Sequence, residues 1–153
     1  MELKQFKKFS NREKIDIIPY IKEYINGHKN VNIWIGTDSQ NRKHNTIYAL
    51  VICLRIEGKG AHLLYTKYEV PRIKENRDRL IKETFDTIEM AEYIKEQIGI
   101  KCEFLDLDLN PDKQFGSNIA FAACVGICSG YGYNFRHKGN SVMTSYAADV
   151  LVK

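Results

Sequence analysis

The chain has 153 residues, of which 44% are hydrophobic and 27% are charged, so it is long enough for one sizeable core and too short for two ordinary domains. It has no apolar run of membrane-spanning length and no export signal, and we therefore expect a cytoplasmic protein without membrane contact. The net charge of +4 is compatible with a polyanionic partner but excludes no functional class.

The four cysteines lie among apolar neighbours, and none belongs to a CxxC pair or to a zinc-ligand spacing. They are Cys53, Cys102, Cys124 and Cys128. We expect buried, reduced thiols.

The N-terminal segment, residues 1–30, is predicted to be a helical cap. Ser10 followed by Glu13 matches a capping box, which predicts a helix start there. Pro19 would divide this helix into two short pieces, and Gly27 would end the second.

Three strands follow, each rich in β-branched and aromatic residues. They cover Val31–Thr37, Thr46–Ile56 and His62–Val70, with a tight polar connection at Glu57–Gly60. The second run is nearly all apolar, which is typical of a central strand covered on both faces. The pattern predicts an antiparallel meander.

The remaining residues alternate between helical and extended patterns. The predicted elements are a long helix over Ile73–Ile98, a strand over Lys101–Leu109, a small-residue helix over Ser117–Ser129, a strand over Tyr133–Arg136 and a last helix over Thr144–Leu151. The order βββαβαβα predicts one α/β domain over residues 31–153, with a mixed five-stranded sheet flanked by helices.

Asp38 is the first candidate for chemistry, because it follows an apolar strand where the chain leaves the core. Asp106 and Asp108 alternate onto one face of the fourth strand. Two carboxylates this close repel each other, so such a pair needs a nearby cation, a basic partner or good solvation. A metal site and a sheet edge open to solvent would each meet that need. Asp108, nearer the strand end, is the stronger candidate ligand. For Asp38, capping of a turn is an equally simple explanation.

Two helical acids lie among apolar or small residues. Glu83 borders the apolar stripe of the long helix, and a carboxylate turned toward the sheet needs a partner. Glu89 and Glu92 are the other helix acids considered for that role, and Asp149 lies within the last helix.

Taken in order, these acids and the βββαβαβα pattern resemble the ribonuclease H-like superfamily. The segments Ile35–Gln40, Leu107–Pro111 and Ala147–Asp149 look like its YkuK-type bacterial branch. The resemblance covers nearly the whole chain from Val31 onward.

The resemblance implies a carboxylate cluster that binds a pair of Mg²⁺ or Mn²⁺ ions, with Asp38 bridging them, Asp108 and Glu83 on one side and Asp149 on the other. Two such ions can activate a water molecule and stabilise the leaving oxygen of a phosphodiester. The expected function is a metal-dependent nuclease acting on RNA, DNA or a hybrid, with a 5′-phosphate and a 3′-hydroxyl as products.

Basic and polar residues near these acids are candidates for substrate contact. His137 and Lys138 follow the fifth strand, where the family often carries a mobile basic loop, although a solvated loop or a simple phosphate contact would explain them equally. The other candidates are Ser39, Gln40, Arg42 and Lys43, which follow Asp38.

Three other functional classes share parts of this pattern. The domain could be a nucleic-acid- or protein-binding module without catalysis. An ATP-binding protein of actin-like fold needs a glycine-rich phosphate turn, which Thr37–Gln40 does not provide. An aspartyl-phosphate phosphatase would carry its Asp-x-Asp pair near the chain start, whereas Asp106 and Asp108 lie on the fourth strand.

The sequence also departs from the well-studied ribonucleases H. It lacks the Asp-Gly-Ser form of the first motif and a tryptophan-rich basic handle, so hybrid specificity does not follow. The only tryptophan, Trp34, is expected in the core.

Overall fold

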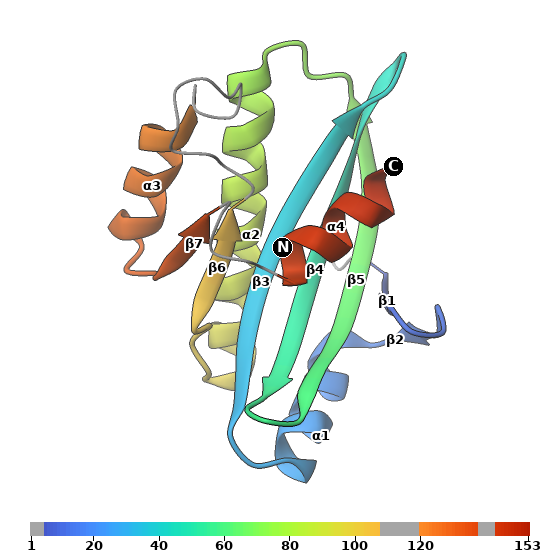
Figure 1. Ribbon diagram of the computed structural model, residues 1–153, viewed down its shortest axis with the longest axis vertical. Helices are drawn as coiled ribbons and strands as arrows, with labels where there is room; N and C mark the ends of the chain where they lie inside the picture. Colours follow the sequence, from blue (N-terminus) through green and yellow to red (C-terminus); the bar gives the residue numbers. More distant parts are fainter. Residues whose placement is uncertain (1–4, 108–119, 138–142) are drawn as a thin grey trace.

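A computed structural model describes residues 5–107, 120–137 and 143–153, without the side chains of residues 137, 143–146 and 149. Its elements in chain order are β1 (Phe6–Lys8), β2 (Lys14–Ile15), α1 (Ile17–Gly27), β3 (Val31–Asn41), β4 (Asn45–Ile56), β5 (Gly60–Pro71), α2 (Asn76–Ile98), β6 (Phe104–Leu107), α3 (Phe121–Gly130), β7 (Phe135–His137) and α4 (Met143–Val152). The strands form one mixed sheet in the order β2-β1-β5-β4-β3-β6-β7 (Figure 1).

The sheet has an antiparallel half and a parallel half. β3, β4 and β5 form the predicted meander, and β6 and β7 add to it in parallel on the β3 side. The predicted α/β architecture is confirmed, and the sheet has two short strands more than expected.

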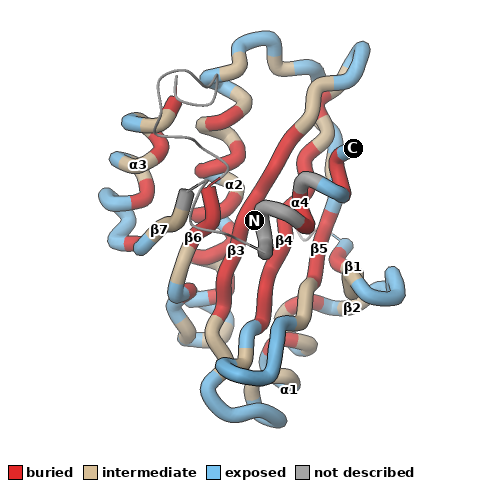
Figure 2. The backbone as a smooth tube through the Cα atoms, viewed as in Figure 1, coloured by how far each residue is buried: buried red, intermediate tan, exposed pale blue. Residues whose placement is uncertain are grey.

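Helices cover both faces of the sheet. Alternate residues of a strand face opposite sides, and Ile33 and Ile35 of β3 belong to the large core cluster that includes residues of α1, α2 and α3. Ala49 and Val51 of β4 face the other way and pack with α4 in a smaller cluster. Figure 2 shows the resulting buried strip along the middle of the central strands. Coverage on both faces explains why β4 is apolar along nearly its whole length.

The predicted helical start at Ser10 is wrong. Residues 8–13 form a turn in which the amide of Lys8 donates to the carbonyl of Glu13 (2.9 Å) and Asn11 Oδ1 accepts from the amide of Glu13 (3.0 Å). Arg12 has a φ of 63°, which no helix allows. The residues with Ser–x–x–Glu spacing therefore form a turn between β1 and β2 and not a capping box.

Pro19 does not divide a helix. It is the third residue of α1, within the first turn, where backbone N–H groups have no intrahelical acceptor. A single helix from Ile17 to Gly27 therefore accommodates the proline.

The other predicted elements are present with shifted ends. α2 begins at Asn76, three residues later than expected, and ends at Ile98 as predicted. Gly99 follows it with a φ of 83°, the left-handed conformation common just after a helix. β6 covers only Phe104–Leu107 of the strand predicted over Lys101–Leu109. Residues 108 and 109, like residues 117–119 of the predicted small-residue helix, lie outside the described residues.

The four cysteines are buried free thiols, as expected. Burial raises the pKa of Cys53, Cys102 and Cys128 to about 12, so these thiols stay protonated at neutral pH. Within the described ranges, none of the helices has the length and apolarity needed to cross a membrane.

Candidate functional site on the central strand

Asp38 lies within β3, which continues to Asn41, so the prediction that the strand ends at Thr37 and the chain leaves the core at Asp38 is wrong. The residue is 6% exposed. It pairs in register with Ala49, whose side chain packs in the cluster under α4, so the alternation of the strand directs Asp38 to the same face. Its Oδ1 accepts a hydrogen bond from the amide of Ser39 at 2.8 Å. A buried carboxylate is thus held on the central part of the sheet, on the face that α4 covers.

Ser39, the next residue, faces α2. Its hydroxyl donates to Glu83, and Arg79 Nη1 donates to the Ser39 carbonyl at 2.8 Å and to its hydroxyl at 2.9 Å. Arg79 Nη1 also lies 3.9 Å from Glu83 Oε1. Two charged residues of α2 therefore fix the backbone and side chain of the residue that follows Asp38.

A second contact ties the same stretch of β3 to α2. The hydroxyls of Thr37 and Thr87 are hydrogen-bonded at 2.7 Å, and both threonines are buried. Glu83, at 4% exposure, therefore approaches β3 from the α2 face, whereas Asp38 belongs to the α4 face. The prediction that Glu83 turns toward the sheet and has a partner agrees with this geometry.

Asp106 lies on β6 beside Gly36, one strand away from Asp38. Its Oδ1 accepts hydrogen bonds from Arg136 Nε (3.1 Å) and Nη2 (3.0 Å). Its Oδ2 is buried and has no hydrogen-bond partner among the described residues. Burial raises the pKa of Asp106 to about 6, although the Arg136 guanidinium opposes that shift.

Arg136 is a residue that the sequence analysis missed. It pairs in register with Asp106 from β7 and lies over the ring of Trp34, with its guanidinium carbon 4.0 Å from the ring centre. Trp34 is 6% exposed and donates to Glu103 at 2.8 Å, which confirms that it is a core residue. The sequence does show a basic residue, Arg136, in a predicted strand and an acidic residue, Asp106, in another. These two residues can be identified as partners only when the order of the strands in the sheet is known.

The polar residues after Asp38 have different surroundings. Arg42 donates to the carbonyl of Val152 at 3.0 Å, so it ties the end of α4 to the β3–β4 connection. Gln40 has a buried Oε1 to which no described residue donates a hydrogen bond, and Lys43 is exposed in the connection itself.

The other predicted site residues are described in part or not at all. Asp108 and Lys138 lie outside the described residues. Asp149 is in α4 and His137 ends β7 in register with Leu107, but their side chains are not described. Among the side chains that the structure does describe, no three His, Cys, Asp or Glu residues form a group that could hold a metal ion.

Comparison with known proteins places the chain in a family. The family model described as Ribonuclease H-like matches residues 16–153, which is nearly the whole chain and includes β3 to α4. No curated protein matches the sequence of this chain. The mixed sheet with helices on both faces is consistent with the fold of that family, and the match covers nearly the whole chain. The chain therefore belongs to the ribonuclease H-like family.

Proposed function

We propose that this protein is a divalent-metal-dependent nuclease that hydrolyses phosphodiester bonds of RNA, DNA or a hybrid. The observation that carries the proposal is the buried carboxylate of Asp38 on the central strand of a ribonuclease H-like chain. Carboxylate oxygens are the ligands that hard divalent cations prefer, and the side chain of Asp38 faces the side of the sheet that α4 covers.

The chemistry of the available donors suits a hard cation. The candidates Asp38, Asp106, Asp108 and Asp149 offer carboxylate oxygens, which Mg²⁺ and Mn²⁺ prefer, and the cysteines are protonated thiols of the core. Asp106 Oδ2 is a buried oxygen with no hydrogen-bond partner in the described ranges, which fits a place beside a cation. In the proposal Asp38, Asp108 and Asp149 hold the ions, and Glu83, which approaches β3 from the α2 face, holds Ser39 and contacts no ion.

The residues of the chain would act mainly by holding these oxygens in place. The Ser39 amide orients Asp38, and Arg79 and Glu83 fix Ser39 from the α2 side. The bound ions would supply the activation of water and the stabilisation of the leaving oxygen. Positioning of this kind matters because small displacements of reacting groups lower rates strongly.

The test is cleavage of labelled RNA, DNA and hybrid duplexes in the presence of Mn²⁺ or Mg²⁺. Asp38→Asn and Asp108→Asn should each abolish cleavage, because an amide does not replace a negatively charged ligand. Asp78→Asn is the matched control, since Asp78 is exposed in the first turn of α2 and should keep full activity.

A binding module without catalysis is the alternative function. The net charge of +4 is compatible with such binding to a polyanion. Binding of nucleic acid without cleavage, equal in the intact protein and in Asp38→Asn, would support that alternative and contradict the nuclease.

A further inference from the structure

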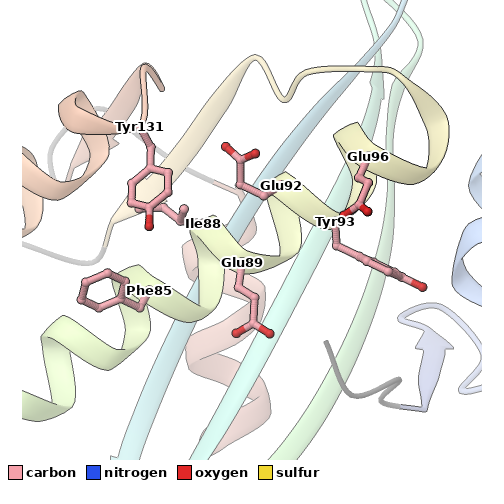
Figure 3. A pocket seen from close by; sticks show the side chains of 7 residues that line it. All are labelled: Phe85, Ile88, Glu89, Glu92, Tyr93, Glu96 and Tyr131. Atoms are coloured by element: carbon pink, nitrogen blue, oxygen red, sulfur yellow. The ribbon is translucent and has the colours of Figure 1, made fainter.

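An open hollow of about 410 Å³ lies between α2 and Tyr131, the residue that follows α3. Figure 3 shows Tyr131 beside Ile88 and Phe85, so an aromatic wall forms on one side of it. Tyr131 is 53% exposed and Phe85 is 44% exposed, and they are two of the three large hydrophobic side chains exposed in the described residues. Because both side chains line the same hollow, they form a continuous apolar surface, unlike single apolar residues scattered over a protein.

The rest of the hollow is acidic. Glu89, Glu92 and Glu96 line it from successive turns of α2. Like charges at this spacing destabilise a helix by about 0.2–0.5 kcal/mol per pair. Within the part of the chain that the structure describes, none of the three forms an ion pair with a lysine or arginine. Their repulsion is therefore not compensated by a basic side chain of those residues.

The charge of this surface restricts what can bind there. The whole chain carries a net charge of +4, but the described residues that line the hollow include three glutamates and no basic residue. A nucleic acid would be repelled. A two-fold dimer through this face would bring the glutamates of one copy against those of the other, which is also unfavourable. The complementary ligand is a cation with an apolar part.

We propose that this hollow docks an arginine-bearing basic segment of a partner protein. A guanidinium is planar and weakly hydrated, so it can stack on the Phe85 and Tyr131 rings while it donates hydrogen bonds to a glutamate. Charge-assisted bonds from guanidinium to carboxylate are also stronger than neutral ones. An aliphatic residue next to the arginine would pack against the exposed aromatic edges.

This surface is separate from the proposed nuclease site. α2 covers one face of the sheet, and Asp38 belongs to the face that α4 covers. Docking in the hollow therefore requires neither a metal ion nor Asp38, and the two proposals can fail independently.

The experiment measures binding of a fluorescein-labelled peptide of alternating arginine and leucine by fluorescence anisotropy. The full chain should bind it saturably without added metal. Combined Glu89→Gln, Glu92→Gln and Glu96→Gln substitutions should weaken binding about tenfold or more, and Tyr131→Ala should weaken it about threefold or more. Glu57→Gln, an exposed acid in the β4–β5 turn, is the matched control and should bind like the unmodified protein.

Two further measurements make the result decisive. A peptide with citrulline in place of each arginine keeps the shape without the charge and should bind at least about tenfold more weakly. Circular dichroism verifies that each variant remains folded. Equal binding of both peptides, equal binding by all variants, or no saturable binding would overturn the proposal. Self-association of the chain that the same variants abolish would also overturn it, because the occupant would then be a second copy.

Discussion

Asp106 and Arg136 form a buried ion pair across the parallel strands β6 and β7, in which a single carboxylate oxygen accepts both guanidinium hydrogen bonds. The other oxygen, Oδ2, is buried and accepts no hydrogen bond from the part of the chain that the structure describes. The pair therefore compensates the buried charge only in part, and this is why the pKa of Asp106 rises to about 6 despite the adjacent cation.

The stability of the protein should depend on the titration of Asp106. Its pKa is raised from 3.8 to about 6 by folding, so between these values the native state keeps a proton that the unfolded state has lost. The free energy of unfolding should therefore fall by up to about 3 kcal/mol as pH rises from about 4 to about 6 and then level off.

Asp106→Asn removes this titration, because an amide stays neutral. Urea unfolding of both proteins across that range should show that the variant loses this part of the pH dependence. A difference in stability between the two proteins that does not change with pH would contradict the assignment.

Arg136→Met should destabilise the protein by about 3 kcal/mol at neutral pH, because it leaves the Asp106 carboxylate buried without a cation. Arg55→Met is the matched control. Arg55 lies 4.7 Å from the centre of the same Trp34 ring but is exposed, and its loss should change stability by less than about 1 kcal/mol. The fluorescence of Trp34, the sole tryptophan, reports unfolding in both variants. Equal effects of the two substitutions would show that stacking, and not the ion pair, stabilises this region.

Ser39→Ala should lower the free energy of unfolding by about 1–3 kcal/mol, since Glu83 loses a buried hydrogen bond from the hydroxyl and Arg79 loses a partly buried one to it. Chemical denaturation measures this change. Ser129→Ala, at an exposed position of α3, should stay within about 0.5 kcal/mol of the unmodified protein. A loss for Ser39→Ala no larger than that of the control would mean that the network contributes nothing to stability.

Gly99→Ala should destabilise the protein by about 1 kcal/mol. Gly99 has a φ of 83°, and an added Cβ would meet no atom within 4 Å, so the effect would come from backbone strain without steric overlap. Gly27 also has open space around it but no positive φ, and Gly27→Ala should be neutral or slightly stabilising. The comparison uses thermal unfolding of both variants, and equal midpoints would rule out strain at Gly99.

The sequence predicted those elements whose hydrophobic pattern is long and regular. The apolar run of β4 predicted a central strand, and the helical spacing of α2 predicted a helix that ends at Ile98. The prediction failed around Ser10, because a capping-box spacing over four residues also fits the turn between β1 and β2. Short patterns of this kind do not distinguish local structures that use the same hydrogen-bonding side chains.

By itself, the sequence determined the α/β architecture, the buried thiols and the candidate acids, because periodicity and residue type are local properties. Only the tertiary structure decided which acids share a face and which residues they meet. Glu83 reaches β3 through Ser39 on the α2 face, and Asp106 meets Arg136, which lies 30 positions away in the chain. These contacts depend on strand order and register, which arise from pairing between segments far apart in the chain. The local sequence of a strand does not identify the strand with which it pairs.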